Sequence, residues 1–398
     1  MMENRDKELI LLGSTGSVGE QAADVALRTG TKVCALVAGN NVKRMEEQAR
    51  LFRPRACAMS DRDAADDLRI RLADTGIRVY AGNEGISALI REQTAVDNGE
   101  RKIVLNAIVG EAGLQSTLDA IESGTDVALA NKESLVVAGE IVMRRAKQHG
   151  VRILPVDSEH CAIFQCLRGE KREKIRRILL TASGGPFYGY TREQLADVTP
   201  ERTLAHPTWK MGAKITVDSA TLMNKGFEVI EAVHLFGVPS EAVEVVVQRE
   251  SIIHSMVEYI DNSIIAQLAV PDMRHCVQYA LSYPDRESGV CQPLDFRQLK
   301  QLHFGVPDTD AFPLLQLAFD AIHAGGALPA VVNAANEIAV AAFLDGRIGF
   351  LQISDVVIKT TQRLDAACRE ETLDGILAAD RSARIVAGEL IKNYGITR

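Results

Sequence analysis

Residues 7–19 read KELILLGSTGSVG, an apolar run that leads into a turn rich in glycine. The run 7–12 predicts a buried strand, and the segment 16–27 predicts a helix. Small residues let the backbone approach a pyrophosphate, and a helix start adds free N–H groups and the positive end of its dipole. We therefore interpret the turn as a dinucleotide-binding site, although its glycines are spaced G-x-x-G-x-x-G instead of G-x-G-x-x-G. A tight glycine turn without a ligand is the alternative.

Short apolar runs recur through the first 150 residues, with helix-like segments between most of them. Further strands are predicted over 32–37, 56–59, 78–81, 102–106, 126–130 and 152–156. Alternation of this kind favours a parallel sheet that helices cover on both faces. The N-terminal part is therefore predicted to be a Rossmann-like α/β domain.

The pattern changes after about residue 150. Segments 251–259 and 263–270 are rich in β-formers and flank residues 260–262, which predicts a hairpin and an antiparallel contribution. The region 283–313 holds four prolines and little periodicity, so we interpret it as a connector. From residue 314 onward the chain is rich in alanine and is predicted to be helical.

Composition narrows the class of protein. The chain has 398 residues, enough for two or three domains of ~100–200 residues each. It is 46% hydrophobic and 25% charged, like soluble globular proteins, and its formal charge of −8 argues against a chain-wide nucleic-acid surface. No apolar run reaches the ~18–20 residues of a membrane span, and the acidic N-terminus fits no signal or transit peptide. Seven scattered cysteines fit free thiols. We expect a cytoplasmic protein without nucleic-acid or membrane partners.

The end of the second predicted strand bears on the choice of cofactor. An NAD site usually places Asp or Glu there, on the ribose 2′-hydroxyl. Residues 37–41 read VAGNN, which contains no acid, and Arg44 follows. Amide donors without a negative charge suit a 2′-phosphate, so NADP is favoured over NAD.

Two carboxylates follow the strand predicted over 152–156. If the extended backbone continued, Asp157 and Glu159 would point to the same side, because side chains alternate with a period of two. Hard carboxylate oxygens suit Mg²⁺ or Mn²⁺. The alternative is helix capping by Asp157 or Ser158, with Glu159 favoured by the helix dipole.

A third carboxylate lies on the helix predicted over 219–235. Asn224, Lys225 and Glu228 share one face of it, because they are spaced i,i+3 and i,i+4. Such a face offers one metal ligand and two donors for an anion or hydroxyl. The alternative is a solvated face with an ordinary Lys–Glu pair.

Three loops add candidate site residues. Residues 182–186, Ala-Ser-Gly-Gly-Pro, follow a predicted strand and could form an anion-binding nest or a plain turn. Residues 204–212 hold the single tryptophan, Trp209, between Pro207 and Gly212, which suggests a lid that excludes water or a loop anchored by its tryptophan. Residues 129–134 join a strand to a helix at the carboxyl edge of the sheet, which faces a ligand crevice in such folds.

Together these segments resemble the 1-deoxy-D-xylulose 5-phosphate reductoisomerase family. The resemblance runs in family order over nearly the whole chain. The matching segments are GSTGSVG (13–19), ALANKES (128–134), LPVDSEH (154–160), ASGGPF (182–187), HPTWKMG (206–212), VDSATLMNKGFEVIEA (217–232), SIIHSMVEY (251–259) and NAANEIAVAAFL (333–344).

The resemblance implies an enzyme that binds NADPH and one divalent metal ion, Mg²⁺, Mn²⁺ or Co²⁺. The implied metal ligands are Asp157, Glu159 and Glu228. The implied NADPH contacts are Thr15, Gly16, Ser17, Val18, Gly39, Asn40, Asn41, Asn131, Glu133 and Gly212. The substrate's reacting end would be held by Lys132 and Ser158 beside the metal ligands. Its phosphate end would be held by Ser183, His206, Ser219, Asn224 and Lys225. The closing loop would carry His206, Trp209 and Met211.

The resemblance also implies an architecture and a reaction. The implied domains are an NADPH-binding domain (1–150), a catalytic and dimerisation domain with a mixed sheet and a lid (151–283), a connector (284–313) and a C-terminal helical domain (314–398), assembled as a homodimer. The implied reaction is a retro-aldol/aldol rearrangement of 1-deoxy-D-xylulose 5-phosphate and reduction by NADPH to 2-C-methyl-D-erythritol 4-phosphate, a step of the non-mevalonate isoprenoid pathway.

Two positions depart from the family pattern. Gln248-Arg249-Glu250 stands where the family often has His-Pro-Gln, and we expect an effect on packing or the dimer interface, not on the metal site. Asn40 stands where a basic residue is often found. Three other classes stay open on the residues alone: an NADP-dependent semialdehyde dehydrogenase with a nucleophilic cysteine, a metal-dependent aldolase or isomerase without redox chemistry, and an NADP-sensing protein without activity.

Overall fold

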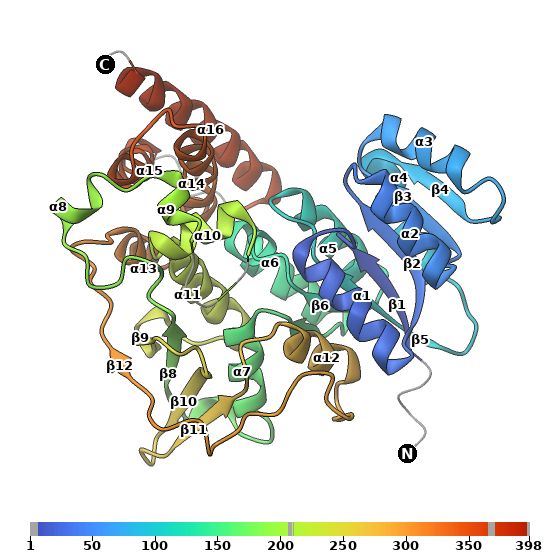
Figure 1. The fold of residues 1–398 in the computed structure, drawn as a ribbon, viewed down its shortest axis with the longest axis horizontal. Helices are drawn as coiled ribbons and strands as arrows, with labels where there is room; N and C mark the ends of the chain where they lie inside the picture. Colours follow the sequence, from blue (N-terminus) through green and yellow to red (C-terminus); the bar gives the residue numbers. More distant parts are fainter. Residues whose placement is uncertain (1–6, 206–208, 210, 365–370, 396–398) are drawn as a thin grey trace. The chain divides into compact units, whose positions relative to one another are not determined.

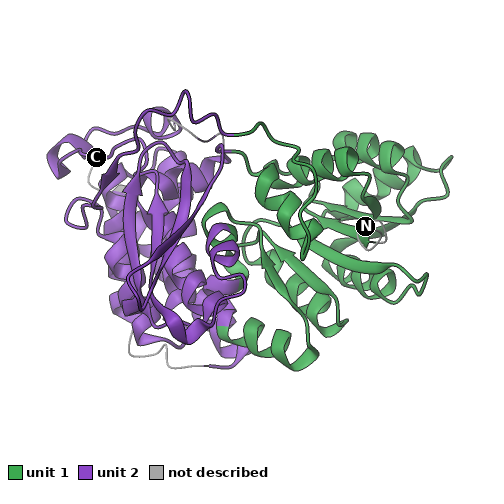
Figure 2. Ribbon diagram, turned by 90° about the horizontal axis from the view of Figure 1, so that it is seen from below, with its two compact units in different colours: residues 1–134, 140–161, 272–293 green, residues 135–139, 162–271, 294–398 purple. Residues whose placement is uncertain are grey.

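The computed structural model describes residues 7–205, 209, 211–364 and 371–395. The chain forms two compact units (Figure 2). Unit 1 comprises residues 1–134, 140–161 and 272–293, and unit 2 comprises residues 135–139, 162–271 and 294–398. The domain boundaries predicted at residues 150, 283 and 313 stay a prediction.

Unit 1 is built on a seven-stranded parallel sheet with the strand order β4-β3-β2-β1-β5-β6-β7 (Figure 1). Its strands are β1 (Lys7–Leu12), β2 (Lys32–Ala38), β3 (Ala56–Met59), β4 (Arg78–Ala81), β5 (Arg101–Asn106), β6 (Asp126–Leu129) and β7 (Ile153–Pro155). The helices between and after them are α1 (Ser17–Thr29), α2 (Val42–Phe52), α3 (Arg62–Arg71), α4 (Gly82–Thr94), α5 (Ala112–Glu122), α6 (Glu133–His149) and α12 (Arg274–Ser282). The predicted α/β arrangement is confirmed.

The order of the strands reverses at β1. This strand pairs in parallel with β2 on one side and with β5 on the other. Its residues 9–12 expose no surface, as a strand covered on both faces requires. Ligands of open α/β sheets bind outside the carboxyl ends of the strands at such a reversal. The predicted dinucleotide turn leaves β1 at this end.

Unit 2 is built on a five-stranded sheet with the order β11-β10-β8-β9-β12. Its strands are β8 (Ile175–Ala182), β9 (Val243–Gln248), β10 (Ile253–Tyr259), β11 (Ile264–Leu268) and β12 (Phe304–Gly305). Within this sheet β8 and β9 pair in parallel and the other described pairs are antiparallel, so the predicted mixed sheet is confirmed. The predicted hairpin joins β10 to β11, where the Tyr259 N–H donates to the Ser263 carbonyl at 2.9 Å.

Helices make up most of the rest of unit 2. They are α8 (Arg192–Leu195), α9 (Pro200–Thr203), α10 (Ala213–Ala220), α11 (Met223–Phe236), α13 (Leu314–Ala324), α14 (Leu328–Leu344), α15 (Phe350–Leu364) and α16 (Leu373–Gly395). Short 3₁₀ turns cover Arg172–Lys174 and Ser240–Ala242. Helix α7 (Ser158–Cys166) continues from the end of unit 1 into unit 2.

The single helix predicted over 219–235 is wrong. The chain forms α10 and α11 instead, and Leu222 between them adopts a left-handed φ of 59°. This conformation costs a non-glycine residue energy and ends the run of i→i−4 hydrogen bonds. The predicted connector 283–313 contains no helix and only the two-residue strand β12.

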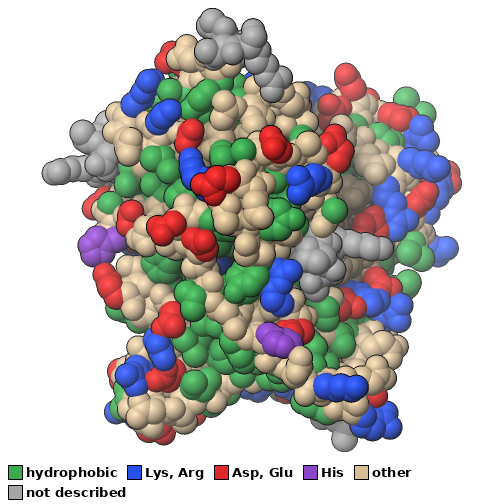
Figure 3. Space-filling model, turned by 60° about the vertical axis from the view of Figure 1, so that its left-hand side comes forward, with side chains coloured by type: hydrophobic (Ala, Val, Ile, Leu, Met, Phe, Trp, Pro, Cys, Tyr) green, Lys and Arg blue, Asp and Glu red, His purple; other side chains and the backbone are tan. Residues whose placement is uncertain are grey.

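Acidic and basic side chains are interspersed on the face of the molecule that Figure 3 shows. The excess of acidic residues therefore forms no single negatively charged patch among the described residues of this face. Among the described residues, no helix is both long and apolar enough to cross a membrane.

Candidate active site

The turn between β1 and α1 has the close packing that a phosphate-binding turn needs. Gly13 adopts φ 77°, and the N–H groups of Gly13 and Ser14 donate to the Val37 carbonyl at 2.8 and 2.9 Å. A Cβ on Gly19 would lie 2.0 Å from the Gly13 carbonyl oxygen, so only glycine fits there. Gly16 is the N-cap of α1 and has no side chain with which to cap the helix. The first N–H groups of α1 can therefore serve an anion.

The predicted NADPH residues of this turn lie at its surface. Gly16 and Ser17 are exposed, and Thr15 and Val18 are partly exposed. Backbone and hydroxyl groups are the only polar groups that these residues present. The turn therefore fits the pyrophosphate of a dinucleotide.

The end of β2 is also accessible, but its neighbouring arginine is engaged. Gly39, Asn40 and Asn41 are exposed, and the Asn41 side chain caps α2 by accepting the Arg44 N–H at 3.2 Å. The Arg44 guanidinium pairs with Glu20 at 2.6 Å and with a glutamate of its own helix at 2.7 Å. Its hydrogen bonds to these carboxylates raise the pKa of Arg44 above its ordinary value. A 2′-phosphate at this edge would contact the exposed amides of Asn40 and Asn41. The charge of Arg44 is already paired with carboxylates.

The turn after β6 is held by buried side chains. The Asn131 amide nitrogen donates to the carbonyls of Ile108 and Gly110 at 2.8 and 2.9 Å, and its oxygen accepts the Ser134 N–H at 2.9 Å. Asn131 also donates to the Glu133 carboxylate at 3.0 Å, and both side chains are buried. These two predicted cofactor residues therefore tie the loop after β5 to the start of α6.

Lys132 in the same turn is paired with a predicted metal ligand. Its Nζ lies 2.8 Å from Oδ2 of Asp157, and the two side chains are 12% and 19% exposed. The other oxygen of Asp157 accepts the N–H groups of Glu159 at 3.1 Å and His160 at 3.3 Å. The extended alternation predicted here is wrong, because α7 begins at Ser158. Asp157 caps this helix and also faces an ammonium group, so the capping alternative and a ligand role are compatible.

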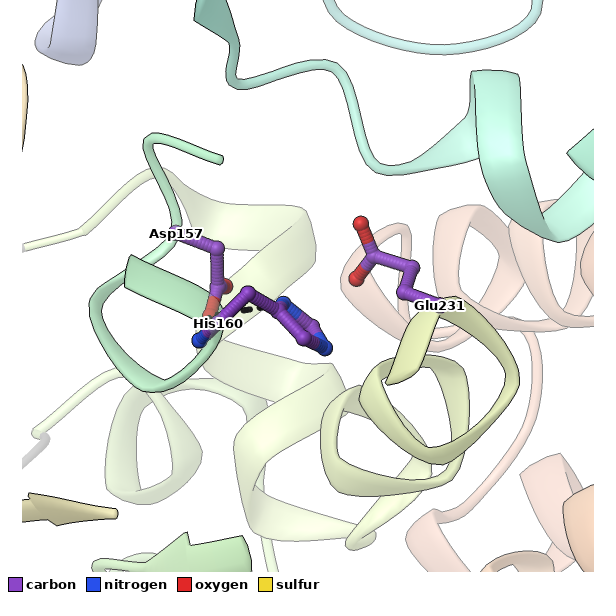
Figure 4. A group of neighbouring side chains, drawn as sticks. All are labelled: Asp157, His160 and Glu231. Carbon is purple, nitrogen blue, oxygen red and sulfur yellow. Dashed lines mark hydrogen bonds and ion pairs between the residues drawn. The ribbon is translucent and has the colours of Figure 1, made fainter. Parts of the chain in front are cut away.

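The first turn of α7 gathers further polar side chains. Ser158 Oγ donates to Oε2 of Glu159 at 2.5 Å. His160 Nδ1 lies 3.1 Å from Oδ1 of Asp157, and its ring is fully buried. Figure 4 shows this imidazole beside the Asp157 carboxylate and draws Glu231 of α11 with them. His160 was not among the predicted site residues. Its position directly after the predicted metal ligand Glu159 could have indicated it.

Helix α11 presents the third predicted ligand. Asn224 Nδ2 donates to Oε1 of Glu228 at 2.5 Å, and Lys225 Nζ donates to Oε2 of the same carboxylate. Lys225 and Glu228 are buried, so the alternative of a solvated face is wrong. The amide oxygen of Asn224 is buried and accepts no hydrogen bond from the described residues. A buried hydrogen-bond acceptor without a partner costs free energy unless a ligand donates a hydrogen bond to it.

The predicted phosphate-binding turn follows β8. Gly184 and Gly185 adopt φ 78° and 66°, and the Gly185 N–H donates to Ser183 Oγ at 3.3 Å. A Cβ on Gly185 would lie 2.7 Å from the Ser219 carbonyl oxygen, so the turn packs against the last turn of α10. Helix α10 is fixed in turn by Asp218, which accepts a hydrogen bond from Asn336 at 2.7 Å. Ser183 and Ser219 therefore belong to adjoining backbone segments.

The predicted lid is described only in part. His206 lies outside the described residues. The Trp209 ring lies 6.3 Å from the ring of His254 on β10, at an angle of 50°. Met211 is partly exposed, and Gly212 is the exposed N-cap of α10.

The described cysteines give no support to the semialdehyde dehydrogenase alternative. Six of them are free, and Cys368 lies outside the described residues. Burial raises the pKa of Cys34 and Cys291 to about 11 and that of Cys57 to about 12. A nucleophilic cysteine needs the opposite shift, because the thiolate is the reactive form.

A glycine turn at the reversal of a parallel sheet, carboxylates that pair with lysines, and a second glycine turn after β8 fit one class of protein, the oxidoreductases that depend on a pyridine nucleotide. The family model for 1-deoxy-D-xylulose 5-phosphate reductoisomerase matches residues 9–139, and models for C-terminal domains of the same enzyme match residues 153–236 and 268–386. The chain belongs to the 1-deoxy-D-xylulose 5-phosphate reductoisomerase family.

Relatives of that name match almost from end to end. The reductoisomerase of Chlorobaculum tepidum is 51% identical over 388 residues, which cover 97% of this chain and 100% of the relative. That of Clostridium botulinum is 47% identical over 395 residues, which cover 98% and 100%. The solved Zymomonas mobilis enzyme in complex with NADPH is 44% identical, with a TM-score of 0.89 over 97% of this chain and 99% of that one. Another solved structure, a DOX-P reductoisomerase in complex with NADPH, fosmidomycin and magnesium, is 37% identical, with a TM-score of 0.89 over 97% of this chain and 98% of that one.

Proposed function

We propose that the protein converts 1-deoxy-D-xylulose 5-phosphate to 2-C-methyl-D-erythritol 4-phosphate, with NADPH as reductant and a divalent metal ion, in the non-mevalonate isoprenoid pathway. The observation that carries the proposal is the match of nearly the whole chain to enzymes of this activity. The site chemistry supports it, because the glycine turn after β1, the three carboxylates and the Ser183–Gly185 turn offer groups that suit a dinucleotide, a divalent cation and a phosphate. The semialdehyde dehydrogenase alternative is not supported.

The glycine turn would bind the cofactor pyrophosphate at the start of α1. Close contact of Gly13 with Ala107 and of Gly19 with Gly13 leaves no space for side chains, so the backbone itself forms the cradle. Asn131 and Glu133 would act by fixing the loop after β5, since their polar groups bond to the protein. Solved relatives in complex with NADPH support this cofactor.

Asp157, Glu159 and Glu228 would hold one divalent cation. These three carboxylates could serve together as ligands of a metal ion. Hard oxygen donors suit Mg²⁺, and relatives solved with magnesium support the same choice. When bound, such a cation polarises carbonyl oxygens and stabilises developing negative charge. Lys132 and Lys225 balance the charge of Asp157 and Glu228 and would donate to substrate oxygens beside them.

The substrate phosphate would be held in unit 2 by hydroxyl, amide and ammonium donors. We assign this role to Ser183, His206, Ser219, Asn224 and Lys225. Remote binding of this end orients the carbon skeleton, and a closing loop with Trp209 and Met211 would keep water out. We also propose that the enzyme is a cytoplasmic homodimer, as the resemblance implies; sedimentation of the purified chain tests the dimer.

The test is a complete assay with 1-deoxy-D-xylulose 5-phosphate, NADPH and Mg²⁺. We expect equimolar loss of NADPH absorbance and formation of 2-C-methyl-D-erythritol 4-phosphate, identified by mass and NMR. Loss of substrate without NADPH oxidation would indicate an isomerase. No reaction under these conditions would refute the proposal.

A further inference from the structure

Arg249 contacts the predicted phosphate-binding turn, although it lies 64 to 66 residues away along the chain. It is the central residue of Gln248-Arg249-Glu250, where the sequence departs from the family pattern. Its Nη1 donates to the carbonyl oxygens of Ser183 at 2.9 Å and Gly185 at 2.8 Å. One nitrogen thus joins both ends of the glycine turn. The departure from the family pattern therefore affects the packing of the turn that is proposed to bind the substrate phosphate in unit 2.

An aromatic ring also packs against the Arg249 guanidinium. The Arg249 guanidinium lies 5.3 Å over the centre of the Tyr188 ring. A Cβ on Gly184 would lie 3.0 Å from the same ring, and a Cβ on Gly305 would lie 2.1 Å from the Tyr188 hydroxyl. Tyr188 is thus confined between two glycines, and it offers Arg249 a fixed face for a cation–π contact.

The hydrogen bond to the Ser183 carbonyl fixes the direction of the peptide group that joins Ser183 to Gly184. The hydrogen bond to the Gly185 carbonyl holds the other end of the turn but orients no N–H, because the next residue is Pro186. A trans peptide is planar, so its C=O and the next N–H point in opposite directions. When the Ser183 carbonyl points to Arg249, the Gly184 N–H points away from it. Both glycines have positive φ and no side chain that limits their conformation. Without the hydrogen bonds from Arg249 the turn could therefore adopt several conformations. An anion nest needs N–H groups that are already oriented.

Arg249 also brings a charge that no acidic side chain of the described residues balances. Its guanidinium pairs with no carboxylate of the described residues, and the adjacent Glu250 contacts His303 at 2.5 Å. A positive charge beside a turn favours an anion there, even when it does not touch the anion.

We propose that Arg249 is a positioning residue, which orients the Ser183–Gly185 turn to receive the phosphate group of the substrate. It acts through the backbone of the turn and not by contact with the reacting atoms. The inference rests on the proposed function, because that function assigns the turn to the phosphate.

The test compares a phosphorylated with a phosphate-free substrate. In Arg249→Ala we expect kcat/KM for 1-deoxy-D-xylulose 5-phosphate to fall on the order of 10- to 100-fold, mainly through KM. For 1-deoxy-D-xylulose, which lacks the phosphate, the fall should stay within about threefold. The inhibition constant of inorganic phosphate should rise together with KM. Guanidinium ion at millimolar concentration should restore part of the loss, whereas sodium chloride at equal ionic strength should not.

Two further variants keep the test decisive. Arg249→Lys preserves the charge and one donor and should keep an intermediate KM, even if the alanine variant is too unstable to assay. Arg297→Ala removes an exposed arginine that pairs locally with Asp295, and should leave both substrates unaffected. Equal losses for the two substrates, or an unchanged KM in both Arg249 variants, would overturn the proposal. A wild-type enzyme without turnover would instead refute the proposed function.

Discussion

At Gly19 there is no room for even one methyl group. A Cβ would lie 2.0 Å from the Gly13 carbonyl oxygen and 2.7 Å from Ser14 Cα, both of them backbone atoms. Gly19→Ala must therefore push α1 away from the turn that is proposed to hold the pyrophosphate. We expect the Kd for NADPH to rise by at least about tenfold, measured by quenching of protein fluorescence.

The matched control is Gly388→Ala in α16, where a Cβ meets no atom within 4 Å. That variant should bind NADPH like the wild type and should be as stable or slightly more stable, because alanine favours a helix. Wild-type NADPH affinity in Gly19→Ala would show that the glycine turn does not form the cofactor site.

Residue spacing could predict part of the site. The spacing of Asn224, Lys225 and Glu228 places them on one helical face, and the structure joins them by hydrogen bonds. Spacing could not show that Lys225 and Glu228 are buried, since burial depends on the elements packed around α11. It also gave no signal for Arg249, whose partners are backbone carbonyls distant along the chain.

At the scale of elements, α11 depends on close contact with α13. A Cβ on Gly226 would lie 2.6 Å from the Cβ of Ala318 on α13. Gly226→Ala should therefore lower the free energy of unfolding by about 1–3 kcal/mol, because two packed helices must separate. Ala318→Gly in the same chain should restore most of this loss. Urea unfolding of the two single variants and the double variant measures the coupling.

A simple sum of the single effects in the double variant would contradict this packing. The outcome also bears on the site, because α11 carries Asn224, Lys225 and Glu228. We expect KM for the substrate to rise in Gly226→Ala and to return toward the wild-type value in the double variant with Ala318→Gly.

Element types could be predicted better than element ends. The strands of unit 1 have apolar runs bounded by turns, and each predicted strand is found. The break between α10 and α11 could not be predicted, because Leu222 is neither glycine nor proline and nevertheless adopts a left-handed φ. The helix start at Ser158 could not be separated from a continued strand, because Asp157 suits both.

At the scale of the whole molecule, pH should act on stability through His234. Burial lowers the pKa of this histidine to about 4, and a Cβ on Gly139 would lie 2.2 Å from its ring. The unfolded chain takes up the proton near pH 6.5, so stability is complete above that pH and is lost between about pH 6.5 and pH 4. We expect about 2 kcal/mol less stability from this group at pH 5 than at pH 7.

Urea unfolding at both pH values measures this effect in the wild type and in His234→Gln. Other groups titrate equally in the two proteins, so the difference between them isolates the histidine. An identical pH dependence in both proteins would mean that His234 is protonated without penalty in the folded chain.

The order of the strands in both sheets could not be predicted from the chain. Alternation predicted a parallel sheet, but the place of β1 between β2 and β5 follows from how the crossovers pack. The parallel pairing of β8 with β9 joins segments on either side of α10 and α11. Motifs could predict candidate site residues, whereas the burial and the hydrogen-bond partners of these residues required the folded structure.

The central claim is that Asp157 and Glu159, together with Glu228 from a distant part of the chain, bind one divalent cation that turnover requires. Titration of Mn²⁺ followed by electron paramagnetic resonance, with NADPH present, tests it most directly. We expect one tight site per chain in the wild type. Asp157→Asn and Glu228→Gln should each weaken Mn²⁺ binding by about tenfold or more and lower turnover by roughly two orders of magnitude, with NADPH affinity unchanged.

Glu244→Gln, which removes an exposed carboxylate of β9, serves as the control and should bind Mn²⁺ like the wild type. The account predicts that Mn²⁺ affinity and turnover fall together in the two site variants and in no control. Wild-type Mn²⁺ affinity in either site variant, or full turnover of the wild type in excess chelator, would contradict it.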